Sequence, residues 1–365
     1  AEWWWTSDRW LFATVSFLMF AGVLLGMAAS PAIAEKLRYD TFHFVSRQVM
    51  FAGLALGVMM LVSLLKVRDI RRLSLLGFFG GLVLMVAALF VGPEIKGAHR
   101  WLDFGPLSIQ PSEFTKPAFV VLAAACLSQW QRTGKPAGLI AGLILYGMFV
   151  GVLIQQPDFG QTILVTATFG ALLFFAGISI WIIGAAVGLA MAGGVAAYFT
   201  VSHVQSRVDR FLNPDSGDTY QVDRAMAAFH NGGFLGVGPG EGTVKAAIPD
   251  AHTDFILAVV GEEFGLIACM MLAAVFCFLV LRALYRSLQC PDSFSQIAAA
   301  GLAVMLGLQA VINMAVNLQL MPAKGMTLPF ISYGGSSIIA LALSVGCLIA
   351  LTRKRPGARR RRPVR

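Results

Sequence analysis

Apolar residues along this chain gather into helix-length runs that shorter polar segments separate. A helix needs about 20 mostly apolar residues to cross a bilayer, whereas strands of membrane barrels use segments of about ten alternating residues. The pattern therefore predicts an all-α integral membrane protein with about ten transmembrane helices. The expected spans are residues 10–32, 46–66, 73–92, 112–130, 137–155, 160–178, 180–201, 254–281, 296–320 and 329–352.

Composition supports a membrane protein. Hydrophobic residues make up 57% of the chain and charged residues 13%, against about 25% charged in soluble domains. Mean hydropathy is +0.74. We expect one polytopic membrane domain over residues 1–352 and a basic tail over residues 353–365. A large extracytoplasmic loop, residues 202–253, should join the seventh and eighth helices.

The basic residues indicate the orientation of the chain. Ten spans place both ends on one side, and Lys and Arg gather in the tail and in alternate loops, which predicts cytoplasmic termini. Those loop residues are Lys66, Arg68, Arg71, Arg72, Arg132, Lys135, Arg282 and Arg286. The net charge of +9 is then mainly a topology signal, although the tail has an alternative role in binding anionic lipid or a cytoplasmic partner.

The strongest candidate for chemistry is the segment from Pro249 to Ile256, which carries His252 and Asp254 where an apolar run begins. A carboxylate at membrane depth is costly, so it marks a functional site by default. The alternative is that Asp254 caps a helix. Glu262 and its neighbour lie eight and nine residues further on, or about 12–14 Å along a straight helix. They are then too distant for direct acid–base partnership and should serve packing or line a polar cavity.

A second group of polar residues lies between the third and fourth spans. It includes Arg100, Trp101, Gln110, Glu113 and Lys116. The spacing of three residues puts Glu113 and Lys116 on one helix face. A local ion pair and a binding role are both compatible with that spacing.

The remaining outer segments add further candidates. Asp158, beside Pro157, either caps the next helix or belongs to the site. Arg210 and Gln221 lie in the 202–253 loop, and the glycine-rich stretch 232–242 lacks the Gly-Lys-Ser/Thr ending of a nucleotide-binding loop. We therefore expect no nucleotide cofactor.

The last outer loop combines two prolines with Lys324, and Ser336 and Ser337 follow it. Such irregular backbone is tolerated at membrane depth only where protein or water covers it, and a helix N-terminus that opens there binds anions. Snorkelling to the interface is the alternative explanation for Lys324.

Six of these segments, taken in order, resemble the SEDS family (shape, elongation, division and sporulation). The matching stretches are 97–101, 110–113 with Lys116, 157–160, 210–214, 249–256 and 324–337. Asp250 stands where the family usually has Glu, and the long arginine tail is not a general family feature. Residues 30–34 and 44–48 resemble the division branch more than the elongation branch.

The resemblance implies a peptidoglycan glycosyltransferase that polymerises lipid II into glycan strands during septal cell-wall synthesis. It implies that Asp254 is the general base and that Arg and Lys side chains stabilise the undecaprenyl pyrophosphate leaving group. The implied substrate-binding residues are Arg100, Glu113, Lys116, Arg210, His252, Lys324, Ser336 and Ser337. The residues expected to support the site structurally are Trp101, Gln110, Asp158, Gln221 and Glu262.

The same resemblance implies partners and a location. A class B penicillin-binding protein with transpeptidase activity is expected, with other division membrane proteins, in the bacterial inner membrane and at the septum. The active site should face the periplasm, and nucleic acid is not an expected partner. A divalent cation (Mg²⁺ or Mn²⁺) is a family-level expectation without a dedicated carboxylate cage. The alternatives are a lipid II flippase, an elongation polymerase and a non-catalytic division scaffold.

Overall fold

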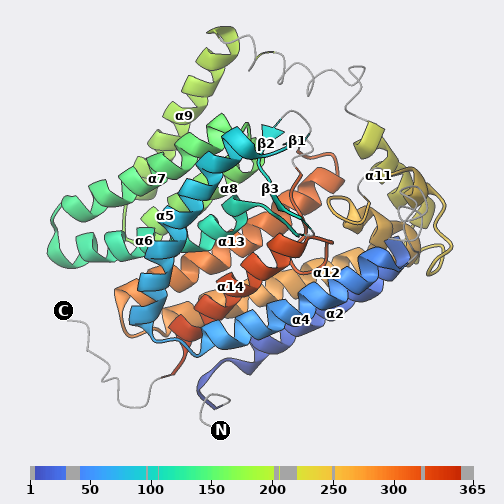
Figure 1. Cartoon of the computed structure of the whole chain (residues 1–365), viewed down its shortest axis with the longest axis horizontal. Coiled ribbons are helices and arrows are strands. Elements are labelled where there is room, and N and C mark those ends of the chain that lie inside the picture. Colours follow the sequence, from blue (N-terminus) through green and yellow to red (C-terminus); the bar gives the residue numbers. More distant parts are fainter. Residues whose placement is uncertain are drawn as a thin grey trace.

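The computed structural model describes residues 5–29, 42–95, 98–105, 107–200, 205, 220–248, 251–321 and 325–354. The described chain has ten long helices. Nine of them pack into a bundle, α9 projects away from it, and the small strands and α11 lie towards one end (Figure 1). The long helices are α2 (Arg9–Ala29), α4 (His43–Ser63), α5 (Val67–Val91), α6 (Pro111–Thr133), α7 (Ala137–Gln155), α8 (Phe159–Phe175), α9 (Ile180–Thr200), α12 (Ile256–Leu288), α13 (Ser293–Asn317) and α14 (Gly335–Thr352). The predicted all-α membrane fold is confirmed.

Shorter elements lie in the connections. Two antiparallel hairpins follow α5, one from β1 (Glu94–Ile95) and β2 (Ala98–His99), the other from β3 (Leu102–Phe104) and β4 (Leu107–Ile109). The connection between α9 and α12 contains α11 (Tyr220–Gly232) and a 3₁₀ turn, η2 (Val244–Ala247).

Eight of the helices are long and apolar enough to cross a membrane. Helices α8 and α6 are not among these eight. Helix α8 is too short, and the first turn of α6 contains the buried Glu113 and Lys116. Side chains on neighbouring helices, rather than lipid, compensate the polar groups of α6.

Several helix boundaries differ from the prediction by a few residues. The largest differences are the end of α12, which continues to Leu288 instead of 281, and the starts of α5 and α14. The basic residues before position 73 belong to α5, which begins at Val67, because long cationic side chains are good helix formers. Helix α14 begins at Gly335 rather than at 329, because Phe330 has a φ of 65° and the following segment is not helical. The predicted broken entrance to the last helix is therefore present.

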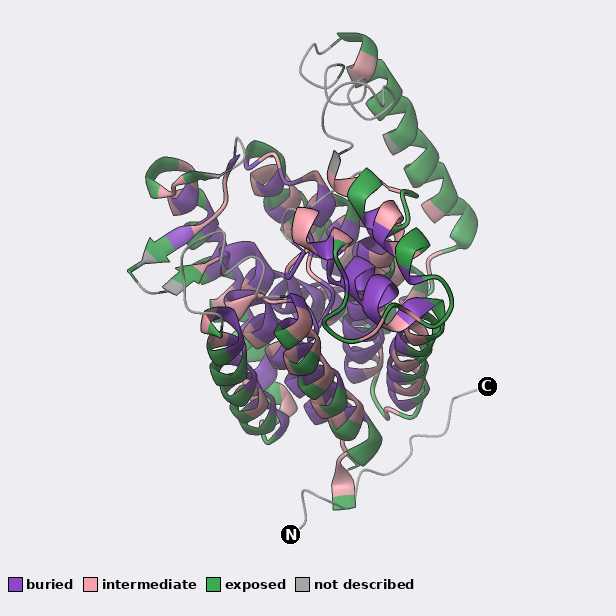
Figure 2. Cartoon of the chain, turned by 90° about the vertical axis from the view of Figure 1, so that its right-hand side faces the viewer, coloured by how far each residue is buried: buried purple, intermediate pink, exposed green. Residues whose placement is uncertain are grey.

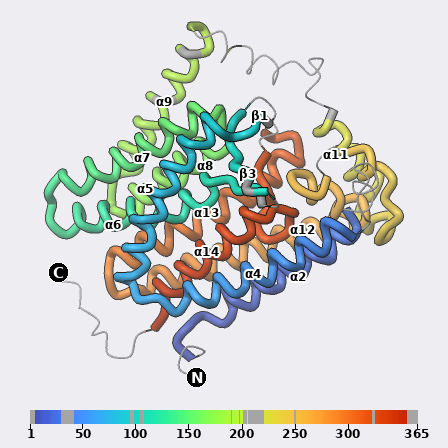
Figure 3. Tube along the Cα trace, viewed as in Figure 1, coloured from blue at the N-terminus to red at the C-terminus, as the bar shows by residue number. Residues whose placement is uncertain are grey.

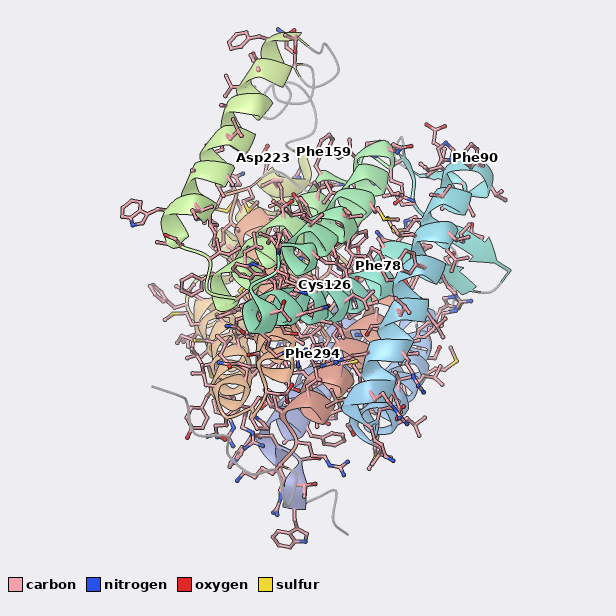
Figure 4. The ribbon with its side chains drawn as sticks, turned by 90° about the vertical axis from the view of Figure 1, so that its left-hand side faces the viewer. Phe78, Phe90, Cys126, Phe159, Asp223 and Phe294 are labelled. Atoms are coloured by element: carbon pink, nitrogen blue, oxygen red, sulfur yellow. The ribbon has the colours of Figure 1, made fainter. Side chains whose placement is uncertain are left out.

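Helices α13 and α14 lie inside the bundle, whereas none of the α9 residues whose burial is described is buried. Figure 2 shows the buried centre and the exposed surface of α9. Aromatic residues fill the packing between α5, α6 and α7, where the ring of Phe78 lies 6.2 Å from that of Phe119 and 6.1 Å from that of Phe149 (Figure 4).

Helices α4 and α14 pack closely although they lie far apart in sequence (Figure 3). A Cβ atom on Gly346 would lie 2.9 Å from the carbonyl oxygen of Met59, and one on Gly335 would lie 2.7 Å from the Phe51 ring. Small residues permit such close approach between membrane helices. This packing holds the start of α14 beside Phe51, in the first half of α4.

Helix α12 is broken near its beginning. Gly265 has φ 78° and ψ −178°, a conformation that suits glycine. The outer segment fills the break, since Val237 N–H donates to Glu262 O (3.0 Å) and Leu266 N–H donates to Gly233 O (2.9 Å). The straight helix assumed from the sequence is therefore wrong.

The two ends of the described chain meet on one side. Lys354 N–H donates to the carbonyl oxygen of Thr6 at 3.0 Å. Nearby, the Asp8 carboxylate pairs with Arg282 (2.9 Å) and Arg286 (3.1 Å), which ties the beginning of α2 to the far end of α12. An even number of spans accounts for this arrangement.

Candidate active site

Asp254 lies in a turn immediately before α12 and is half-buried. Its carbonyl oxygen accepts hydrogen bonds from the Nδ2 atoms of Asn313 (2.9 Å) and Asn317 (3.0 Å) of α13. Asn317 Oδ1 also accepts from Ala258 N–H at 3.2 Å, in the first turn of α12. Asn313 and Asn317 thus hold the Asp254 turn through its backbone carbonyl and not through its carboxylate.

The loop that follows Lys324 lies beside Asp254. A Cβ atom on Gly325 would lie 3.7 Å from Asp254 Oδ2. Asn313 Nδ2 donates to Met326 O at 2.6 Å, so one asparagine binds both the Asp254 turn and this loop. Segments about 70 residues apart in sequence are thereby held together.

His252 joins the same assembly through its backbone and its ring. Tyr333 N–H donates to His252 O at 2.8 Å. The His252 ring lies 4.9 Å from Phe44 and 5.4 Å from Tyr333. His252 therefore packs α4 against the last outer loop, whatever it contributes to substrate binding.

Glu113 and Lys116 form the ion pair that their spacing predicts, and both are buried. Lys116 Nζ lies 2.9 Å from the Glu113 carboxylate and 3.2 Å from Gln309 Oε1 of α13. Gln161 Nε2 of α8 donates to Glu113 at 2.6 Å, and Ser337 Oγ donates to it at 3.5 Å. Three helices besides α6 thus contribute to one buried polar cluster.

Asp158 caps α8, as predicted, because its carboxylate accepts from Gln161 N–H at 3.3 Å. It also pairs with Arg100 at 3.6 Å, and Gln110 Nε2 approaches it at 3.5 Å. Burial raises the pKa of the Asp158 carboxyl, and the positive charge of Arg100 opposes that shift. Gln110 N–H lies 3.5 Å from Ser336 Oγ, which connects this group to α14.

Arg100 has additional partners that the sequence did not indicate. Its guanidinium donates to the carbonyl oxygens of Gln156 (3.3 Å) and Pro157 (3.1 Å). Arg100 therefore anchors the hairpin region to the turn between α7 and α8. Trp101 is half-buried beside it, with its carbonyl oxygen 2.5 Å from where a Cβ on Gly92 would lie.

Glu262 and Glu263 bind the outer segment. Glu262 is fully buried and accepts from Asn231 Nδ2 (2.9 Å), Val244 N–H (2.8 Å) and Lys245 N–H (2.7 Å). Glu263 pairs with Lys245 Nζ. The predicted structural role of Glu262 is supported by this geometry, and half-buried Gln221 lies at the other end of α11.

Replacing Glu262 by Ala should destabilise the protein, because two backbone N–H groups and an amide would lose their acceptor. Each buried group left unsatisfied costs about 1–3 kcal/mol. We expect a lower thermal unfolding temperature in detergent, with Glu262→Gln closer to wild type. An unchanged unfolding temperature for Glu262→Ala would contradict the role.

Some predicted residues and ligands are not placed by these contacts. Arg210 and Lys324 lie outside the described residues. Among the residues that are described, no three His, Cys, Asp or Glu side chains gather as a metal site requires. The described side chains therefore do not assemble a protein-held site for a divalent cation.

Several members of the polar cluster are not among the site residues predicted from the sequence. The most informative are Gln309, Asn313 and Asn317, which recur every four residues in an otherwise apolar span. That spacing places three amides on one helix face, and polar groups inside a membrane helix mark function. Gln161 and Lys245 belong to no such repeated spacing, so the sequence indicates their roles less clearly.

The fold and this cluster define a polytopic membrane protein with a half-buried carboxylate and buried ion pairs gathered towards one end of its helices. The chain belongs to the FtsW/RodA/SpoVE family: the family model, described as "Cell cycle protein", matches residues 8–356. The SEDS resemblance is confirmed.

Relatives share nearly the whole chain. It is 48% identical over 358 residues to a "Probable peptidoglycan glycosyltransferase FtsW" of Caulobacter vibrioides, covering 98% of this chain and 92% of that protein. A protein of the same description from Geobacter sulfurreducens is 37% identical over 348 residues, covering 92% of each chain.

Solved structures agree. One described as "Structural coordination of polymerization and crosslinking by a peptidoglycan synthase complex" has a TM-score of 0.79 and 28% identity, covering 95% of this chain and 97% of that one. Thermus thermophilus RodA has a TM-score of 0.68 and 27% identity, covering 96% of this chain and 98% of that one.

Proposed function

We propose that this chain is a peptidoglycan glycosyltransferase that polymerises lipid II during septal wall synthesis. The observation that carries the proposal is the clamped turn at Asp254, whose carboxylate faces the loop after Lys324. Relatives named peptidoglycan glycosyltransferase FtsW support it over nearly the full chain.

In this proposal Asp254 is the general base. It removes the proton from the 4-hydroxyl of the acceptor N-acetylglucosamine as that oxygen attacks the anomeric carbon of the donor N-acetylmuramic acid. The bond from that carbon to the undecaprenyl pyrophosphate breaks, and the configuration inverts, as in other single displacements at sugars.

The leaving pyrophosphate requires positive charge that is not already neutralised. Lys116 and Arg100 are paired with Glu113 and Asp158, so we assign them mainly to positioning the cluster. We assign Lys324 and Arg210, which the family resemblance implies for substrate binding, to the pyrophosphate, because cationic side chains stabilise the charge that develops on a leaving group. Ser336 and Ser337 would support the same region from the start of α14.

We derive no step through a divalent cation, because the described side chains do not assemble one. The expected class B penicillin-binding partner is supported by the likeness to a peptidoglycan synthase complex. The proposed location in the inner membrane at the septum, with cytoplasmic termini, is supported by the family match and by the charge asymmetry of the loops.

The test is glycan synthesis from purified lipid II by the full chain with its transpeptidase partner. Polymer detected by gel electrophoresis is the expected product. The contrary result is a complex, with its partner shown to be bound, that moves lipid II across the membrane of vesicles and makes no polymer. That result would identify the chain as a lipid II flippase and not a glycosyltransferase.

Replacing Asn313 by Ala should lower turnover while leaving substrate affinity nearly unchanged. One amide holds both the Asp254 turn and the loop at Met326, and misplacement by about 1 Å can cost roughly 100-fold in rate. Asn313→Asp keeps the shape but loses the donor. The assay compares kcat and KM of both variants with wild type; a change in KM alone would contradict a positioning role.

A further inference from the structure

Four cationic side chains line a hollow at the beginning of α5. Lys66, Arg68, Arg71 and Arg72, with Val67, border an open space of about 490 Å³. Ligand-binding pockets commonly enclose about 300–1,000 Å³. The positive-inside bias explains an excess of basic residues on one side but does not require them to share one concavity.

The hollow lies at the opposite end of the bundle from Asp254. The Arg71 guanidinium stacks 3.8 Å above the ring of Phe294, in the first turn of α13. Asn313, which binds the Asp254 turn, is 19 residues further along that helix, or about 28 Å at 1.5 Å per residue. Figure 4 places Phe294 far from Asp223 and Phe159 at the outer end.

The charges around the hollow are not balanced. Arg132, at the end of α6, adds a fifth cation whose charge repels that of Arg71. Among the described residues none of these five cations forms an ion pair. The nearby acids are Asp69, in the first turn of α5, and Asp292. The Asp292 carboxylate accepts the Ser295 N–H at 2.9 Å and attracts the Arg71 guanidinium more strongly than Arg132 repels it, so five cations face two acids.

Exposed apolar side chains adjoin these cations. Leu64 at the end of α4 is 50% exposed, and Leu61 and Leu76 are 68% and 73% exposed. Leu61 and Leu64 precede Lys66, and Leu76 lies one helical turn beyond Arg72. A ligand with an anionic head and apolar chains would match both surfaces, whereas a soluble anion would use only the cations.

We propose that this hollow binds the phosphate headgroup of an anionic phospholipid of the adjacent leaflet, with its acyl chains along Leu61 and Leu76. The guanidinium groups of Arg68, Arg71 and Arg72 suit phosphate oxygens because they donate in pairs. The site is independent of the polymerisation chemistry and belongs to the face that the basic loops predict to be cytoplasmic.

The experiment uses the full chain in nanodiscs that contain phosphatidylglycerol in phosphatidylcholine. Native mass spectrometry counts retained phosphatidylglycerol for wild type, for Arg68→Gln/Arg72→Gln, and for the control Lys135→Gln/Lys354→Gln, which removes two exposed cations of the same face outside the hollow. Each basic residue near an anionic surface contributes about a factor of five in affinity, so the double variant should bind roughly 25–30-fold more weakly. The control should bind like wild type.

Equal loss in both variants would overturn the site, since general surface charge would explain it. No loss in either would also overturn it and leave an acidic protein as the occupant of the hollow. Competition by soluble glycerol phosphate at the same concentration as lipid would show a soluble phosphate ester instead. Arg68→Lys/Arg72→Lys, which keeps the charge but loses the paired donors, should bind between wild type and the double Gln variant and guards against loss through misfolding.

Discussion

Asp254→Asn is expected to abolish glycan synthesis while leaving the fold intact. The substitution keeps the shape of the side chain and removes its basicity, and general-base catalysis contributes about 10²–10⁴-fold in rate. The fold should survive because Asn313 and Asn317 bind the backbone carbonyl of Asp254, not its carboxylate. Polymer formation from lipid II with the partner present measures the loss.

Asp223→Asn is the matched control for that experiment. Asp223 is an acid on α11 at the same end of the molecule, and its carboxylate accepts a hydrogen bond from Gln319 at 3.1 Å at an exposed site. This variant should polymerise at close to the wild-type rate. Equal product from Asp254→Asn and wild type would remove Asp254 from the mechanism, and equal loss in both variants would indicate a general effect of charge.

Lys116→Met should produce a large loss of stability. Lys116 is 1% exposed and Glu113 is 5% exposed, so the substitution leaves a buried carboxylate without its cation. Removing one member of a buried pair costs about 3–5 kcal/mol. Unfolding temperature and resistance to denaturing detergent provide the measurement.

The double variant Glu113→Gln/Lys116→Met separates pairing from packing. It removes both charges and keeps side chains of similar length, so it should recover much of the stability that Lys116→Met loses. A glutamine can still contact Gln161 and Ser337. The single variant Glu113→Gln completes the comparison. If the losses of Glu113→Gln and Lys116→Met simply add in the double variant, the pair is not coupled and the interpretation is wrong.

Local sequence patterns predicted the features that depend on local physics. Apolar runs located all ten long helices, a spacing of three residues placed Glu113 beside Lys116, and Asp158 before an apolar run indicated a cap. Each of these depends on neighbours within about one helical turn. The sequence contained enough information for them without knowledge of the bundle.

The features that sequence analysis missed depend on tertiary contacts. The positive φ of Gly265 is stabilised by residues 233–238, and Arg100 binds carbonyl oxygens more than 50 positions away. Gln309, Asn313 and Asn317 could have been recognised as one polar face, but their acceptors belong to two distant loops. No local pattern specifies such partners.

The break at Gly265 divides α12 mechanically. Residues 256–264 are hydrogen-bonded and salt-bridged to the outer segment through Glu262, Glu263 and Lys245, whereas the rest of α12 continues across the bundle. The short first part should therefore open and close as one cooperative unit with residues 231–245, and amide hydrogen exchange would report both together. Asp254 stands two residues before that unit, so a partner that binds the outer segment should move the Asp254 turn through residues 256–264.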